Sequence, residues 1–199
     1  WSEPLEGVFP TRAKEDGEKI ETFSFAGRSA VSPAVKTARP KVFIPVFPGT
    51  NCEMDSKRAF ERAGGEVEMQ ILANLTPEVL DESIHQMAKK IRQSQIIMIP
   101  GGFSGGDEPD GSAKFITAVF RNPAVSDAVT ELLEKRDGLM LGICNGFQAL
   151  IKLGLVPYGK IVEAKEDAPT LTYNSIGRHA SCLVNTRIAS VKSPWLAGT

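Results

Sequence analysis

A cysteine lies where a predicted strand meets a predicted helix, in the segment Gly142-Ile143-Cys144-Asn145-Gly146. The spacing is that of a nucleophile elbow, in which glycines stand two positions before and two after the nucleophile. Small residues there leave room for a strained turn, and the N-terminus of the following helix would favour the thiolate. The pattern predicts nucleophilic catalysis by Cys144, with the Asn145 N–H as an oxyanion donor. The alternative is an inert, buried cysteine.

A glycine-rich segment, PGGFSGGD (Pro100–Asp107), follows the preceding predicted strand and holds four glycines within six residues. Such a loop lets backbone N–H groups approach a ligand closely. It is not a phosphate-binding P-loop, because no Lys-Ser/Thr pair follows Gly106. The segment therefore predicts a backbone-lined binding loop, and a flexible loop without a ligand is the alternative.

The elements that position these residues alternate between strand and helix from Lys41 onward. Strands are predicted over 41–47, 66–72, 95–100 and 138–143, and helices over 53–63, from Thr76 through Ile91, 113–120, 125–135 and 145–153. This order predicts an α/β fold, a Rossmann-like parallel sheet with helices on both faces. Its carboxyl edge would carry the loops PGTN, PGGFSGGD and CNG. Further on, TLTYNS and ASCLVNTRIAS predict additional antiparallel strands near the C-terminus.

Composition excludes several classes of protein. The 199 residues carry a net charge of −1 with both signs interspersed, which argues against a nucleic-acid-binding or membrane-binding surface. No apolar run approaches the ~20 residues that span a bilayer. Three widely spaced cysteines form neither a disulfide framework nor a metal-ligand pattern, so we expect a reducing, cytoplasmic setting and no metal site. Residues 1–40 lack periodicity and are predicted to be a linker or tail, and residues 41–199 a domain.

Several segments together resemble one enzyme family, the class I glutamine amidotransferases. The similarity narrows to the glutaminase domain of phosphoribosylformylglycinamidine synthase, in its large single-chain form. The segments that carry it, in matching order over about residues 41–199, are PGTNCEMD, IPGGFSGGDEPDGSAK, GLMLGICNGFQALIKLGL, LTYNSIGRH and SPWL. WSEPLEGVFPTRA resembles the end of the preceding synthase part, running into a linker.

The resemblance implies a function and a set of site residues. Cys144 would attack the carboxamide of glutamine to give a thioester and ammonia. The ammonia would serve the ATP-dependent amidation of formylglycinamide ribonucleotide in purine biosynthesis. No cofactor is expected in these residues, whereas ATP and magnesium belong to the rest of the enzyme, and the synthase domain of the same chain is the expected partner. The oxyanion donors would be Asn145 with Gly102 or Phe103, and the substrate-binding residues Asn51, Ser104, Asp107 and Gln148.

The catalytic base is missing from this pattern. In the family it is a histidine followed two residues later by a glutamate, and this sequence has only two histidines. His85 lies one position off the apolar stripe of a predicted helix, and His179 is followed two residues later by Ser181. We therefore expect the domain to be incomplete at its C-terminus and residues 1–199 alone to turn over little glutamine.

Two other functions remain open on the residues alone. The first is a cysteine-elbow α/β-hydrolase acting on esters, whose residue order would allow His179 as the base. It does not account for PGGFSGGD. The second is a non-catalytic module of the same fold with an inert Cys144.

Overall fold

The computed structural model describes residues 3–8, 24–25, 27, 36–106, 111–171 and 173–196. The chain divides into two compact units: residues 34–172, and residues 1–33 together with 173–199. Within the described part of the smaller unit lie the short 3-10 helices η1 (Glu3–Leu5) and η4 (Pro194–Leu196). An isolated bridge joins Phe25 to Ser190. All the other helices and strands belong to the larger unit.

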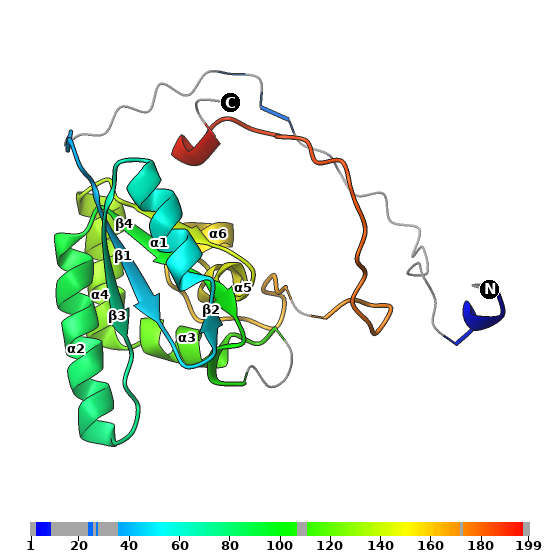
Figure 1. The fold of residues 1–199 in the computed structure, drawn as a ribbon, viewed down its shortest axis with the longest axis horizontal. Coiled ribbons are helices and arrows are strands. Elements are labelled where there is room, and N and C mark those ends of the chain that lie inside the picture. The colour runs from blue at the N-terminus through cyan, green and yellow to red at the C-terminus, as the bar shows by residue number, and fades with distance from the viewer. Residues whose placement is uncertain are drawn as a thin grey trace. The chain divides into compact units, whose positions relative to one another are not determined.

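The larger unit is built on a four-stranded parallel sheet with the strand order β3-β1-β4-β6 (Figure 1). The strands are β1 (Lys41–Val46), β3 (Glu66–Ile71), β4 (Ile96–Ile99) and β6 (Leu139–Gly142). Continuous runs of β-branched and other apolar residues favour central strands that are buried on both faces. The predicted parallel α/β sheet is confirmed, and each predicted strand of this part lies within two residues of its observed bounds.

Helices connect the strands and cover both faces of the sheet (Figure 1). They are α1 (Glu53–Arg62), α2 (Pro77–Gln93), α3 (Lys114–Phe120), α4 (Pro123–Thr130), α5 (Asn145–Leu153) and α6 (Leu155–Tyr158), with a π-helical turn η3 (Glu131–Lys135) continuing α4. The predicted cap of α2 is present, because the Thr76 hydroxyl accepts a hydrogen bond from the N–H of Val79 at 3.3 Å. At the other end of α2, the Arg136 guanidinium donates to the carbonyls of Ile91 and Ser94.

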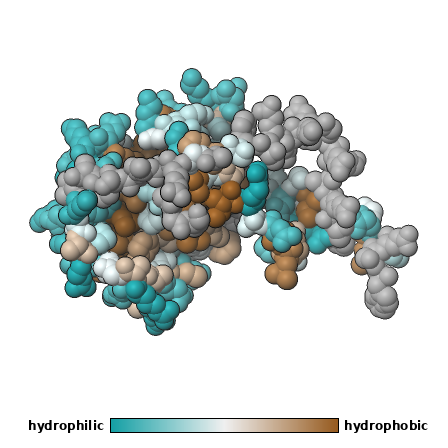
Figure 2. All heavy atoms as spheres, turned by 90° about the horizontal axis from the view of Figure 1, so that it is seen from above, coloured by the Kyte–Doolittle hydropathy of each residue, from teal (hydrophilic) through white to brown (hydrophobic). Residues whose placement is uncertain are grey.

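The core lies on the two faces of the sheet and follows the alternation of each strand. Phe43 and Ile97 point to one face, where they pack with apolar residues of α2, α3, α4 and α5. Ile44 and Met98 point to the opposite face, which Phe60 of α1 helps to cover. Figure 2 shows hydrophobic side chains of the larger unit gathered toward the middle of the face in view, with hydrophilic ones around them.

A second, two-stranded antiparallel sheet lies in the loops and was not predicted. It pairs β2 (Thr50–Asn51) with β5 (Gly101–Gly102), through Thr50 opposite Gly102 and Asn51 opposite Gly101. It joins the loop after β1 to the loop after β4, two segments that the sequence presents only as turns.

The strands predicted over TLTYNS and ASCLVNTRIAS are wrong for the residues that the structure describes there, 169–171 and 173–196. These residues carry no strand, only the bridge from Ser190 to Phe25. A strand needs a neighbour for its N–H and C=O groups, and one bridge, with one hydrogen bond from the Phe25 N–H to the Ala189 carbonyl, does not supply a ladder.

In the described residues, no helix has the length and apolar character to cross a membrane.

Candidate active site

Cys144 lies between β6 and α5, on an exposed turn with a backbone conformation that is unusual for a residue with a side chain. Its φ is 54° and its ψ is −114°. Backbone hydrogen bonds hold the turn on both sides of the cysteine: the Ile143 N–H donates to the Ile99 carbonyl and the Gly146 N–H donates to the Pro100 carbonyl, each at 3.1 Å. The thiol therefore projects from a turn that is anchored to the end of β4.

Gly142 and Gly146, the two glycines of the elbow, lie where there is no room for a Cβ atom. A Cβ at Gly146 would lie 2.1 Å from the carbonyl oxygen of Ile99. A Cβ at Gly142 would lie 2.6 Å from the carbonyl oxygen of Gly146. Distances below 3.0 Å are not tolerated by real Cβ atoms, so both positions admit only glycine unless α5 moves away from the sheet. The predicted G-x-Cys-x-G pattern thus has a packing reason at each glycine.

The small β2–β5 sheet brings the glycine-rich loop against the cysteine. A Cβ at Gly101 would lie 3.1 Å from the Cβ of Cys144 and 3.6 Å from its Sγ, so the backbone of β5 passes directly beside the thiol. On the other side, a Cβ at Gly49 would lie 2.2 Å from the carbonyl oxygen of Phe103, which makes this turn equally crowded. The glycine-rich loop and the elbow therefore pack against each other through their backbones.

The hydrogen bonds around this small sheet distinguish between Gly102 and Phe103, the two alternatives predicted for the second oxyanion donor. The Phe103 N–H donates to the Gly49 carbonyl at 2.9 Å and is therefore already used. Antiparallel pairs alternate between bonded and non-bonded positions, which places the next pair, Thr50 opposite Gly102, in the non-bonded class. The Gly102 N–H consequently points away from β2, and of the two residues it is the better placed donor.

Three of the predicted site residues form one polar network. The Asn145 Oδ1 accepts hydrogen bonds from the Ser104 hydroxyl at 2.8 Å and from the Ser104 N–H at 3.3 Å. The Asn145 Nδ2 donates to the Gln148 Oε1 at 3.1 Å. Ser104 is 2% exposed and Asn145 is 1% exposed. The network connects the glycine-rich loop to the first turn of α5.

The structure describes one of the other two predicted substrate residues. Asn51 is exposed and lies opposite Gly101 in the small sheet, one pair from Gly102 and beside the backbone that contacts Cys144. Asp107 lies outside the described residues. Asn51 therefore belongs to the same edge of the sheet as the thiol.

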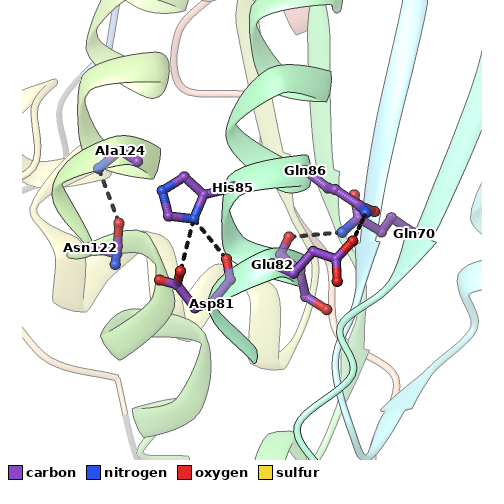
Figure 3. A network of polar contacts seen from close by, with 8 residues as sticks. Gln70, Asp81, Glu82, His85, Gln86, Asn122 and Ala124 are labelled. Atoms are coloured by element: carbon purple, nitrogen blue, oxygen red, sulfur yellow. Dashed lines mark hydrogen bonds and ion pairs between the residues drawn. The ribbon is translucent and has the colours of Figure 1, made fainter. Parts of the chain in front are cut away.

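The histidine of the larger unit lies on α2 and bonds within its own helix. Figure 3 shows His85 beside Asp81. The His85 Nδ1 lies 2.9 Å from the Asp81 carbonyl oxygen and 3.3 Å from the Asp81 carboxylate. His85 is exposed and lies off the apolar stripe of α2. His179 and Arg178 belong to the smaller unit, where both are exposed.

The remaining cysteines provide a comparison for Cys144. Cys52 is exposed and also has a positive φ, 65°, at the N-terminus of α1. Cys182 is exposed in the smaller unit.

Across the described ranges, no three His, Cys, Asp or Glu side chains come together as a metal ion would require.

The larger unit is thus an α/β domain with an exposed cysteine at a glycine-flanked elbow, beside a glycine-rich loop at the edge of a parallel sheet. The family model of the CobB/CobQ-like glutamine amidotransferase domain matches residues 39–199, and the chain belongs to that family.

Curated relatives are subunits named phosphoribosylformylglycinamidine synthase subunit PurQ. The chain is 34% identical to that of Dehalococcoides mccartyi over 141 residues, which cover 71% of this chain and 49% of the relative. It is 35% identical to that of Methanococcus maripaludis over 132 residues, which cover 64% and 44%. The chain thus spans about half the length of the curated relatives it matches. A solved structure, that of PurLQS from Thermotoga maritima, is 29% identical with a TM-score of 0.41, covering 59% of this chain and 45% of that chain.

Proposed function

We propose that this chain hydrolyses glutamine and supplies the ammonia to a synthase. The Cys144 sulfur attacks the carboxamide carbon, and the oxyanion forms beside the N–H groups of Asn145 and Gly102. The C–N bond then breaks, ammonia leaves with a proton from a general acid, and water releases glutamate from the thioester. His85 bonds to Asp81 on its own helix, so we do not assign it as the general acid or base.

This proposal rests mainly on the position of the Cys144 thiol. Cys144 is exposed, it lies on a turn with φ 54° at the N-terminus of α5, and the backbone of Gly101 passes beside it. A nucleophile in this position can meet a carbonyl carbon while N–H groups from two chain segments face the carbonyl oxygen. Membership of the glutamine amidotransferase family selects glutamine among possible carbonyl substrates.

The further fate of the ammonia is part of the same proposal. The relatives are named as subunits of phosphoribosylformylglycinamidine synthase, which supports ATP-dependent amidation of formylglycinamide ribonucleotide as the consuming reaction. The synthase would be either another part of the same chain or a separate subunit. ATP and magnesium would bind to that synthase, and a cytoplasmic location stays a prediction.

Asn51 and Gln148 are the described residues that we assign to substrate binding. Both lie on the same edge of the sheet as Cys144, Asn51 in the small sheet and Gln148 one turn into α5. Asp107 keeps its predicted role as a substrate-binding residue.

The test is chemical labelling of the intact enzyme that contains this chain, followed by mass spectrometry of the three cysteines. A diazoketone analogue of glutamine should modify Cys144 and leave Cys52 and Cys182 unmodified, and excess glutamine should protect Cys144. Iodoacetamide should modify all three, since all are exposed. Cys52 is the matched control, because it is also exposed at a helix N-terminus with a positive φ.

Other outcomes separate the alternatives. Equal labelling of the three cysteines by the glutamine analogue, without protection by glutamine, would support the non-catalytic module. Hydrolysis of ester substrates at a rate that does not depend on glutamine would support the α/β-hydrolase. Sequencing past Thr199 tests the base directly, since a His-x-Glu pair within several dozen residues would complete the site.

A further inference from the structure

The side chain of Asn145 joins two segments that must act together in the proposed reaction. It accepts from the hydroxyl and the N–H of Ser104, 41 residues away in the sequence. We propose that Ser104 and the Asn145 side chain are positioning residues, which fix the glycine-rich loop against the elbow so that the Gly102 N–H and the Asn145 N–H face the same oxygen. This inference rests on the proposed glutaminase function, and it replaces the substrate-binding role predicted for Ser104.

The side chains of Ser104 and Asn145 are buried and paired with each other, which argues against a role in holding the substrate. Ser104 is 2% exposed and Asn145 is 1% exposed, whereas the Cys144 between these segments is exposed. The Ser104 hydroxyl already donates at 2.8 Å to Asn145. Buried polar groups are held by such partners, and this pairing ties the backbone of the loop to α5.

The loop needs such a tie because its own residues set its shape weakly. Gly102, Gly105 and Gly106 all have positive φ, with values of 116°, 62° and 83°. Glycine populates many backbone conformations, so a glycine-rich loop loses more entropy than other loops when it is held in one of them. A hydrogen bond from Ser104, two residues after Gly102, holds the donor end of the loop to α5.

The same network sets the direction of the Gln148 amide. A backbone N–H can only donate, so the Asn145 atom that faces the Ser104 N–H is the oxygen. The Asn145 nitrogen then faces Gln148, which must present its oxygen, at 3.1 Å. The Gln148 nitrogen is left on the other side of the amide as a donor. Through Gln148, the network thus favours an acceptor on the substrate, such as a carboxylate.

The test compares three variants of the intact enzyme: Ser104→Ala, Asn145→Ala and the double variant. Ser94→Ala is the matched control, because Ser94 is 3% exposed and its hydroxyl also donates at 2.8 Å, to Lys90 on α2. The glutaminase kcat and KM are measured, with the rate of Cys144 alkylation by iodoacetamide as a measure of the intact elbow.

We expect kcat to fall by roughly 10- to 100-fold in Ser104→Ala, because displaced oxyanion donors cost about that much or more. The KM for glutamine should change by less than about threefold, and iodoacetamide should still alkylate Cys144, since the loss is one of transition-state stabilisation. The double variant should be no worse than the more severe single one, because both remove the same contact. Ser94→Ala should keep the kcat of the original enzyme.

Three results would overturn the inference. A raised KM with unchanged kcat in Ser104→Ala would return Ser104 to substrate binding. Independent, multiplying losses in the double variant would show that the two side chains do not act together. An equal fall of kcat in Ser94→Ala would show a general effect of a lost buried hydroxyl. If Asn145→Ala does not fold, Ser104→Ala, which deletes one oxygen, decides by the same split of kcat and KM. An original enzyme without glutaminase activity would instead refute the proposed function, before any variant is made.

Discussion

Replacing Cys144 by glycine should stabilise the protein relative to replacing it by alanine. The φ of 54° and ψ of −114° are the mirror image of a common backbone conformation and match the first central position of a type II′ turn, where glycine dominates. Holding a residue with a Cβ in a sparsely populated conformation costs about 1–3 kcal/mol. Glycine avoids this cost but loses about 0.5–1 kcal/mol more conformational free energy on folding. Taking the middle of both ranges, the net advantage of Cys144→Gly over Cys144→Ala is therefore about 1 kcal/mol.

The assay is urea and thermal unfolding of the two variants side by side. Both lack the sulfur, so the comparison isolates the backbone, and each kcal/mol should raise the Tm by about 2–4 °C in a chain of this size. The same pair of substitutions at Cys182 is the control. Positive φ values in the described residues include that of Cys144 and not that of Cys182, so Cys182→Gly should be no more stable than Cys182→Ala.

An alanine variant as stable as the glycine variant at position 144 would refute the reasoning. It would mean that the turn relaxes to an ordinary conformation without loss, and that the structure around Cys144 does not enforce the strain. Both Cys144 variants should lack glutaminase activity, because neither retains a nucleophile.

Three further predictions concern the packing of α5 and the start of α2. Gly146→Ala should destabilise the protein by about 1–3 kcal/mol in urea unfolding, because the new Cβ starts 2.1 Å from the Ile99 oxygen and ordinary contact begins at 3.4 Å; unchanged stability would contradict this. Thr76→Ala should cost about 1 kcal/mol, because it removes the cap that accepts from the Val79 N–H, and a loss too small to measure would speak against the cap. The pKa of Glu78 is lowered from 4.5 by its own backbone N–H and by the Thr76 hydroxyl. The ionised form is thus favoured in the folded protein, so its stabilisation is complete above pH 4.5 and is lost as the pH falls through the lower folded value. Glu78→Gln should therefore reduce stability at neutral pH and not in strong acid, and a deficit that persists in acid would exclude this ionisation as its source.

Local patterns predicted the elbow and its helix well. The helix predicted over 145–153 is α5 as observed, because an apolar stripe ends at a glycine, Gly154, which takes the left-handed conformation of a helix C-terminus. The glycines at 142 and 146 belong to the same five-residue pattern as Cys144. Features that depend on residues near in sequence are visible in the sequence, since propensity and spacing describe them.

Contacts between distant segments were not visible. The β2–β5 sheet has two residues in each strand, too few for alternation to appear, and it forms because its two loops meet at the same edge of the parallel sheet. The role of Ser104 depends on a hydrogen bond to Asn145, which no local pattern contains. Conversely, ASCLVNTRIAS has strand propensity but finds only a single bridge at Ser190 among the described residues. Propensity predicts a strand, whereas a partner decides whether one forms.

The end of β4 positions both halves of the site. The carbonyls of Ile99 and Pro100 bind the N–H groups on either side of Cys144, and Gly101, the next residue, passes beside the thiol and leads to the Gly102 donor. Ile99, Pro100 and Gly101 therefore hold the strained turn at Cys144 and determine where the glycine-rich loop begins. Proline has a fixed φ, which restricts the orientation of the Pro100 carbonyl that accepts from the Gly146 N–H. The nucleophile and the start of the glycine-rich loop are thus held by one segment, and the hydrogen bonds between Ser104 and Asn145 hold the loop beyond Gly102.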